Sequence, residues 1–242
     1  MRRKQLSGPI RIVALNGSPN KNGNTSTLMQ WVVEGAAGVG PVTHTWIDIA
    51  DRNIEYCRGC YHCLRHQRCV IRDDMDEIMK LLLEADGAIA GSPVYEGAPS
   101  AQMKTVMDRV SLFCLYRGVF DGKHAVGVAT SGVAPTKRTA KECATMFGRP
   151  SGLVRTTTAS ISGRYTDLNA ANYPKVREKA FKTGRKLVRD IRAPGRLSGS
   201  SVKYAWIGWL RRNFLKRLIV NNPEQFKGVL DDWRAWGWLN KR

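Results

Sequence analysis

The sequence lacks the features that would place it in a membrane or in the secretory pathway. No stretch approaches the roughly 18 to 20 consecutive apolar residues that a membrane-spanning helix requires. The basic N-terminus, MRRKQLSGPIRIVALNG, is not followed by the apolar run of roughly 7 to 15 residues and the cleavage site of a signal peptide. We therefore expect a cytoplasmic protein, with peripheral attachment to a membrane surface as the alternative.

Acidic residues are scarce. The 242 residues include 39 Lys and Arg but only 20 Asp and Glu, which gives a net charge of +19. Such a charge attracts nucleic acid, anionic lipid, acidic proteins and phosphorylated ligands, but it carries no information about the fold. The excess is concentrated in residues 195–242, where ten basic residues stand against three acidic ones and five of the seven tryptophans occur.

Strands and helices are predicted to alternate through most of the chain. Short apolar or alternating segments predict strands, and amphipathic segments after them predict helices. The predicted strands are residues 10–15, 43–49, 86–91, 123–132 and 152–162, and the predicted helices lie near 24–38, 74–85, 103–113, 137–146 and 174–191. Five such alternations predict an α/β fold with a parallel sheet covered by helices on both faces.

A polar loop, NGSPNKNGNTS at residues 16–26, joins the first strand to the first helix. Ligands of parallel sheets bind beyond the carboxyl ends of the strands, and the backbone N–H groups that open a helix bind phosphate. Ser18, Asn20, Asn24 and Thr25 offer hydroxyl and amide donors there, and Asn24, Thr25 or Ser26 could cap the helix. The loop is neither a GxGxxG fingerprint nor a Walker loop, so spacing alone leaves a phosphate site and a simple capped turn both open.

Three segments, each after a predicted strand, carry a family resemblance: LNGSPNKNGNT, SPVYEGAPSAQMKTVMDR and TSG. Together they resemble the flavodoxin-like, NAD(P)H-dependent FMN reductases over residues 10–190. The resemblance implies a doubly wound, five-stranded parallel sheet that binds FMN at a dimer interface. It implies phosphate contacts from the residues of the first loop and flavin-ring contacts from later residues. The latter are Pro93, Val94, Tyr95 and Gly97, with Ser131 and Gly132 near the other edge of the ring.

Many members of that family have Arg where this chain has Asn20, and Lys21 could supply the missing charge. Other residues of these motifs have structural explanations. Lys104 and Asp108 have the i,i+4 spacing of an intrahelical ion pair. The isolated Cys114 and Cys143 are expected to be buried apolar residues. We predict no catalytic acid or base.

Four further cysteines, Cys57, Cys60, Cys63 and Cys69, form the pattern C-x2-C-x2-C-x5-C. Because disulfides are rare in a reducing compartment, clustered thiols predict metal or redox chemistry. The tight first three are typical of iron–sulfur ligation, and the fourth would complete a single 4Fe–4S cluster. Four thiolates also suit zinc, although zinc sites more often use two separated pairs. A role without metal is the third possibility.

An FMN domain with this cysteine motif between its second strand and the next helix resembles the iron–sulfur flavoproteins. That resemblance implies a homodimer or homotetramer in which the cluster of one subunit lies near the flavin of another. It implies an FMN-dependent oxidoreductase that passes electrons between ferredoxin or NAD(P)H and a small-molecule acceptor such as a quinone. The alternatives are an NAD(P)H-dependent FMN or quinone reductase with zinc or no metal at the cysteines, and a non-catalytic redox sensor that acts through the basic tail.

The predicted domains are a flavodoxin-like FMN-binding domain at 8–193, with its cluster loop at 57–69, and a helical extension at 194–242. Two helices are expected in the extension, at 202–219 and 224–238. An apolar ridge is predicted on the first at Val202, Trp206, Leu210, Phe214 and Leu218. The favoured interpretation is a helical pair packed on the core or on a neighbouring subunit. Membrane-surface contact through 202–242 and docking of an acidic partner such as ferredoxin are alternatives, and nucleic-acid binding is the least favoured.

Overall fold

A computed structural model describes residues 8–120, 123–147, 157–167, 172–192 and 213–239. Five strands form one parallel sheet in the order β2-β1-β3-β5-β6. They are β1 (Ile10–Asn16), β2 (Val42–Asp48), β3 (Gly87–Tyr95), β5 (His124–Ser131) and β6 (Thr157–Arg164). Counted along the chain, this is the strand order of flavodoxin-like folds, which confirms the predicted fold class.

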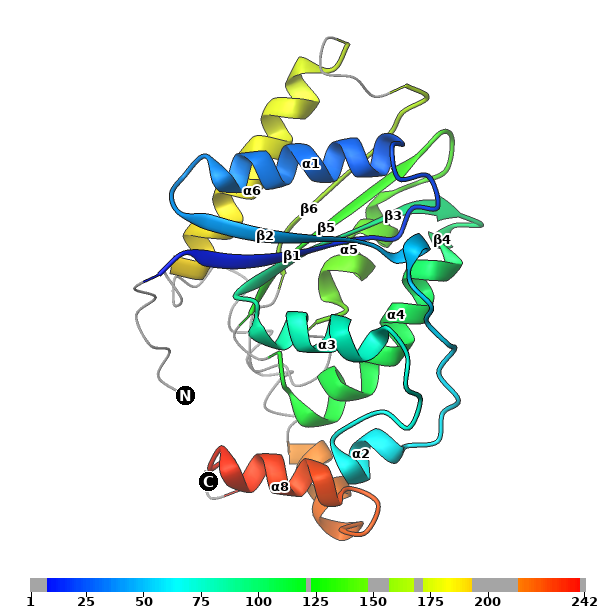
Figure 1. Ribbon diagram of the computed structural model, residues 1–242, viewed down its shortest axis with the longest axis vertical. Helices are drawn as coiled ribbons and strands as arrows, with labels where there is room; N and C mark the ends of the chain where they lie inside the picture. Colours follow the sequence, from blue (N-terminus) through cyan, green and yellow to red (C-terminus); the bar gives the residue numbers. More distant parts are fainter. Residues whose placement is uncertain (1–7, 121–122, 148–156, 168–171, 193–212, 240–242) are drawn as a thin grey trace.

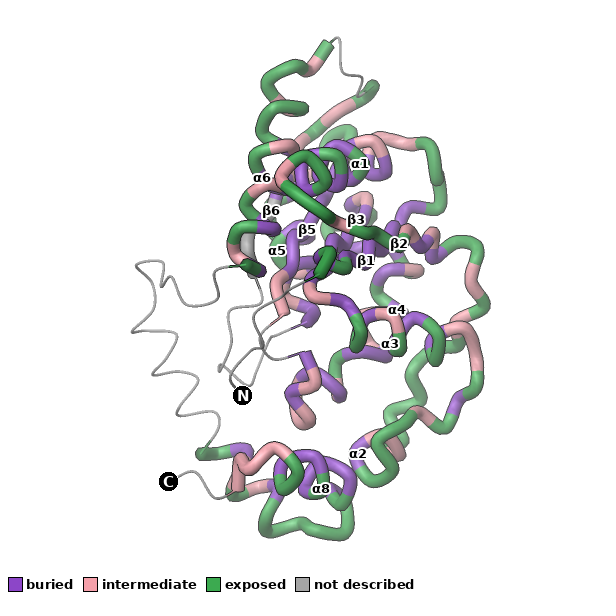
Figure 2. Tube along the Cα trace, turned by 60° about the vertical axis from the view of Figure 1, so that its left-hand side comes forward, coloured by how far each residue is buried: buried purple, intermediate pink, exposed green. Residues whose placement is uncertain are grey.

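Helices cover both faces of the sheet (Figure 1). On one face lie α1 (Asn24–Ala37) and α6 (Pro174–Arg192), and on the other lie α3 (Met75–Glu84), α4 (Ala101–Leu112) and α5 (Lys137–Thr145). Alternate residues of β1 serve the two faces, because successive side chains of a strand point in opposite directions. Ile10 and Ile12 pack with α1 and α6, whereas Val13 and Leu15 pack with α3 and α4. Buried residues therefore fill most of β1, β3 and β5, whereas the edge strand β2 is largely exposed (Figure 2).

Shorter elements connect the main ones. A 3-10 turn, η1 (Ile49–Asp51), and the small helix α2 (His62–His66) lie between β2 and α3. The π-helical turn η2 (Phe113–Arg117) continues α4. The C-terminal segment contains a helical stretch at 213–221 and α8 (Lys227–Ala235). The predicted boundary at 193–194 lies outside the described residues.

The third strand is longer than predicted. It runs to Tyr95 and not to Gly91, and its last residues pair antiparallel with β4 (Ala98–Pro99). Glu96 and Gly97 connect the two strands with φ values of 47° and 71°. Two successive residues with positive φ are typical of the tight turn of a β-hairpin, in which glycine adopts this conformation without strain.

Two predictions about helix surfaces are wrong. The N-cap position of α1 is Gly23, without a side-chain capping bond, so Asn24, Thr25 and Ser26 lie inside the first turn. In the helical stretch at 213–221, Phe214 is 69% exposed, whereas Leu215 and Ile219 are buried. The first three residues of the predicted ridge lie outside the described residues. No helix in the described part of the chain is both long enough and apolar enough to cross a membrane.

We expect Gly127→Ala to destabilise the fold, because a β-carbon at this position in β5 would collide with the carbonyl oxygen of Ala140 in α5. Overpacking of this kind costs about 1–3 kcal/mol in the free energy of unfolding, which urea titration followed by circular dichroism would measure. Gly8→Ala is the control, since nothing lies within 4 Å of the added carbon. Equal stability of the two variants would contradict the close packing of α5 on the sheet.

Candidate functional site

The loops after β1, β3 and β5 meet at the carboxyl edge of the sheet, as the sequence predicts. The Gly17 N–H donates to the carbonyl oxygen of Gly91 at 2.8 Å, which joins the first two loops. The hydroxyl oxygens of Thr25 and Thr130 lie 2.7 Å apart, which joins the first to the third. The Ser100 hydroxyl, at the start of α4, donates to the carbonyl oxygen of Gly17.

The end of β6 belongs to the same site, which the sequence did not indicate. The Tyr165 N–H donates to the carbonyl oxygen of Ser131 at 2.7 Å, and the Asn24 amide donates to the carbonyl oxygen of Tyr165 at 3.0 Å. Asn16 was missed as well. Its buried amide donates to Ser26 at 2.9 Å and to Asp48 at 2.6 Å. An asparagine at the end of an apolar strand was the available signal.

Ser18 and Asn20 shape the first loop. The Asn16 side chain accepts from the Ser18 N–H at 3.1 Å, and the buried Ser18 hydroxyl donates to the carbonyl oxygen of Asn20 at 2.9 Å. Lys21 pairs with Asp51 at 2.9 Å, so its charge is already matched by a carboxylate. The loop therefore relies on its backbone and on the start of α1 for positive potential.

The N-terminus of α1 has the properties of an anion site. It has no side-chain capping bond and no acidic residue in its first turn. The first N–H groups of a helix lack partners within the helix and carry a partial positive charge. A phosphate at this position would receive those donors, together with the side chains of Asn24 and Thr25. These residues fit the phosphate of a flavin nucleotide.

The loops after β3 and β5 form a platform beside this anion site. Pro93 of β3 is in register with Thr130 of β5, so the two loops leave the sheet side by side. Tyr95 is 52% exposed and Val133 is 84% exposed, which presents apolar surface for a flat ring. Gly97 and Gly132 are exposed too, with no atoms near the position of a β-carbon. A ring could approach the backbone closely at either glycine.

Two other predicted flavin contacts have structural roles. The Val94 side chain is buried and packs against Ala129 and Ala140, so only its backbone is available to a ligand. The Ser131 hydroxyl accepts from the N–H groups of Val133 at 3.1 Å and Ala134 at 2.8 Å, which shapes its loop.

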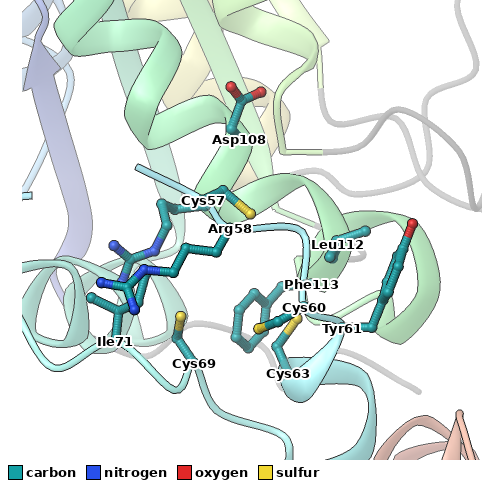
Figure 3. A pocket seen from close by; sticks show the side chains of 11 residues that line it. Cys57, Arg58, Cys60, Tyr61, Cys63, Cys69, Ile71, Asp108, Leu112 and Phe113 are labelled. Atoms are coloured by element: carbon teal, nitrogen blue, oxygen red, sulfur yellow. The ribbon is translucent and has the colours of Figure 1, made fainter. Parts of the chain in front are cut away.

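The four clustered cysteines line a single cavity, which is not lined by the loops after β1, β3 and β5, called the flavin loops below. Figure 3 shows their sulfur atoms arranged around it, with Ile71, Leu112 and Phe113 forming an apolar wall. Arg58, Tyr61, Asp108 and Arg109 complete the lining. Cys57 and Cys60 are exposed, whereas Cys63 and Cys69 are partly buried. The structure therefore brings together all four predicted ligands.

The four thiols line a shared cavity and do not form a ready-made site for one metal ion. Across the described residues, no three His, Cys, Asp or Glu side chains converge closely enough to hold a single metal ion. Burial raises the pKa of the Cys63 thiol to about 11, and the neighbouring Cys69, Cys57 and Cys60 raise it as well. A cationic iron–sulfur core would favour the thiolate forms, and thiolates are the ligands that such cores use.

A buried ion pair fixes both ends of the cysteine segment, residues 57–69, to α4. Arg109 donates to the two carboxylate oxygens of Asp73 at 2.7 and 3.0 Å and to the carbonyl oxygen of Glu55 at 2.8 Å. The Asp73 carboxylate also accepts from the N–H groups of Glu55 and Met75. Burial opposes ionisation of Asp73, but these hydrogen bonds outweigh it and lower the pKa of the carboxyl.

The helix α4 links the two sites. Ser100, its N-cap, lies at the flavin loops, and Asp108, Arg109 and Leu112 line the cysteine cavity. Eight residues of helix from Ser100 to Asp108 rise roughly 12 Å. The predicted intrahelical ion pair is present on the surface of α4, where the Lys104 Nζ lies 2.6 Å from the Asp108 Oδ1. Cys114 and Cys143 are buried, as predicted.

The five-stranded parallel sheet, with helices on both faces and polar loops meeting at its carboxyl edge, defines a flavodoxin-like α/β protein. Residues 10–165, more than half of the chain, match the family described as NADPH-dependent FMN reductase. The chain belongs to this family, which confirms the predicted resemblance.

Relatives refine the family assignment. The chain is 39% identical over 126 residues to an iron–sulfur flavoprotein of Methanocaldococcus jannaschii, covering 51% of this chain and 65% of the relative. That alignment spans less than two thirds of the relative. An iron–sulfur flavoprotein of Clostridioides difficile is 27% identical over 231 residues, covering 93% of this chain and 98% of the relative. A solved flavone reductase has the same fold, with a TM-score of 0.63 and 16% identity over 78% of this chain and 65% of that structure.

We expect Asn22→Asp to weaken FMN binding to the apoprotein. Asn22 is exposed immediately before the N-cap of α1, and a new negative charge there would repel the phosphate. The dissociation constant, measured by quenching of flavin fluorescence, should rise about three- to tenfold. Gln30→Glu adds the same charge at an exposed position farther along α1 and should leave binding unchanged. Equal weakening by both variants would count against a phosphate at the helix N-terminus.

We expect Arg109→Gln to lower the free energy of unfolding by about 3–5 kcal/mol, because it leaves the Asp73 carboxylate buried without its partner. Guanidinium unfolding of the metal-free protein would measure the loss. The pair between Arg138 and Glu142, in which the arginine side chain is 82% exposed, provides the control: Arg138→Gln should cost about 1 kcal/mol or less.

The pair between Arg109 and Asp73 also predicts that the free energy of unfolding depends on pH. Since folding lowers the pKa of Asp73, the stability from its ionised form is present above the unfolded pKa of about 4 and is lost as the pH falls through the folded pKa. An Asp73→Asn variant should lose less stability over that range than the wild type. Parallel pH profiles would contradict the role assigned to the pair.

Proposed function

We propose that this protein is an FMN-dependent oxidoreductase that holds a 4Fe–4S cluster on Cys57, Cys60, Cys63 and Cys69. It would transfer electrons between a donor, ferredoxin or NAD(P)H, and a small-molecule acceptor such as a quinone. One observation carries the proposal: the four thiols line one cavity, and the helix that forms its wall begins at the flavin loops.

The FMN part rests on family membership and on the chemistry of the sheet edge. The N-terminus of α1 and the side chains of Asn24 and Thr25 would receive the phosphate. Pro93, Tyr95 and Gly97 would lie along the ring on one side, with Ser131 and Gly132 on the other. Backbone N–H groups near the ring would stabilise its reduced, anionic form, which is how a protein adjusts a cofactor that performs its own chemistry.

The cluster part rests on the donor set and its surroundings. The four thiols line one cavity, and the tight spacing of the first three is typical of iron–sulfur ligation and less typical of tetrahedral zinc. Arg58 and Arg109 lie in the cavity wall and would offset the negative charge of four thiolates. Leu112 and Phe113 would exclude water from one side of the core.

When both groups are bound, FMN would exchange electrons in pairs, and the cluster would exchange them one at a time. The residues around them would therefore position the two groups and adjust their potentials, and proton transfer by a side chain is not required. We propose a homodimer or homotetramer in which a second copy covers exposed apolar side chains at both sites. Tyr95 and Val133 at the flavin loops, and Tyr56, Tyr61 and Val70 on or beside the cysteine segment, are such side chains.

The direct test is anaerobic purification, followed by an absorption spectrum and quantitation of iron, sulfide and FMN. We expect about four iron, four sulfide and one FMN per chain, the content of a single cube beside one flavin. FMN accompanied by zinc, or by no metal after reconstitution, would favour the simpler NAD(P)H-dependent reductase. Absence of FMN after reconstitution would exclude both reductase proposals.

Single substitutions would then assign the ligands. Cys63→Ala should abolish most of the iron and sulfide content while leaving FMN bound, because the flavin loops do not contact Cys63. Cys143→Ala is the matched control, since this buried cysteine lies in α5 and does not line the cavity. Equal iron content in the two variants would contradict the proposed ligand set.

A further inference from the structure

The C-terminal segment, residues 213–239, packs directly on the cysteine segment. Figure 1 shows α8 beside α2, the helix that carries Cys63. Leu64 of α2 is 1% exposed and lies in an apolar core formed mainly by C-terminal residues. These are Leu215, Ile219, Phe226, Val229, Leu230 and Trp233. Cys63 and Leu112 border this core, so the C-terminal segment contacts residues of the cysteine cavity although it lies outside the family match.

A polar network also joins α8 to the end of α2 and to the turn after α4. The Gln67 amide donates to the Asp232 carboxylate at 2.7 Å and to the carbonyl oxygen of Gly228 at 3.2 Å. Arg117, in the turn after α4, pairs with the other oxygen of Asp232 and donates to the carbonyl oxygen of Gln67 at 2.7 Å. The side chains of Arg117 and Asp232 are each 11% exposed. A single carboxylate on α8 therefore holds Gln67 both directly and through Arg117.

Gln67, which lies between Cys63 and Cys69, has an unfavourable backbone conformation. It ends α2 with φ 61°, in the left-handed region that residues other than glycine seldom adopt. This residue reverses the chain between Cys63 and Cys69. Strained conformations persist where surrounding contacts hold them, and the contacts here come from α8 and Arg117. The relative placement of the third and fourth thiols thus depends on them.

The packing of α8 on α2 is close at the backbone. A β-carbon at Gly228 would lie 2.8 Å from the carbonyl oxygen of Arg65. Trp233 anchors the other side of α8, where its indole N–H donates to the carbonyl oxygen of Tyr116 at 3.0 Å. Contact at two levels, backbone and side chain, restricts how far α2 can move.

We propose that α8, through Asp232, positions the chain between Cys63 and Cys69 for cluster binding and so controls how firmly the cluster is held. Asp232 is a positioning residue that acts through Gln67, and the inference rests on the proposed function of the four thiols. Because coupling between two equilibria is reciprocal, cluster binding would in turn stabilise the docked C-terminal segment.

The test uses the full-length chain, loaded with iron and FMN anaerobically, and the iron chelator bathophenanthroline disulfonate. Asp232→Asn should release iron about tenfold faster than the wild type, since the charged acceptor shared by Gln67 and Arg117 is lost. Asp231→Asn is the matched control, because the neighbouring carboxylate is exposed and pairs only with Arg234 among the described residues. It should release iron at the wild-type rate, and FMN content should be unchanged in both.

A second measurement does not depend on the cluster. In the metal-free protein, iodoacetamide should alkylate Cys63 and Cys69 faster in Asp232→Asn than in Asp231→Asn, while the rate at Cys143 stays the same. If the wild-type protein binds no iron, the proposed function fails, and alkylation still tests the positioning role. Equal alkylation and iron-release rates in the two variants would overturn the inference.

If Asp232→Asn does not fold, Gln67→Ala removes the hydrogen bonds that the Gln67 side chain makes to Asp232 and Gly228, and it leaves the Arg117–Asp232 pair in place. The exposed neighbour Arg68 provides its control as Arg68→Ala. Faster alkylation of Cys63 and Cys69 in Gln67→Ala alone supports the inference, and equal rates in both variants overturn it.

Discussion

The buried ion pair between Arg109 and Asp73 fixes the position of the cysteine segment. Arg109 reaches the carbonyl oxygen of Glu55 before the first cysteine and the Asp73 carboxylate after the last one. Because a charge this deeply buried is costly without its partner, neither end can move away from α4 alone. Since α4 starts at Ser100, where the flavin loops meet, one helix sets the distance between the two sites. The same helix therefore determines where both proposed cofactor sites lie within one chain.

Close backbone packing explains why α4 can lie where it does. A β-carbon at Gly17 would stand 2.6 Å from the β-carbon of Met103, so only glycine allows the first turn of α4 to approach the end of β1. The Ser100 hydroxyl completes this contact by donating to the Gly17 carbonyl oxygen and accepting from the Met103 N–H. The need for glycine at position 17 thereby fixes where α4 starts relative to the end of β1. The flavin loops and the wall of the cysteine cavity are therefore joined by one continuous helix.

Much of this arrangement could be predicted from the sequence, because the informative signals are local. Apolar runs predicted the strands, and the cysteine motif predicted that four thiols would lie together. Tertiary contacts decide the features that were missed. The extension of β3 to Tyr95 depends on pairing with β4, and the burial of Asn16 depends on Asp48 and Ser26. In the helical stretch at 213–221, basic residues interleave with apolar ones. Periodicity alone therefore did not show that Leu215 is buried and Phe214 is exposed.

The positive charge, which the sequence could not assign to a partner, has a local consequence at the cysteines. Arg58, Arg65, Arg68 and Arg72 lie on or next to the cysteine segment, and all four are exposed. A cube held by four thiolates carries net negative charge, and its potential depends on the charges and solvent around it. Cations at short range would favour the reduced, more negative form of a cluster at this position. These four arginines also make the surface beside the exposed Cys57 and Cys60 basic, so part of the excess positive charge lies where it would act on a bound cluster and not only in the C-terminal residues.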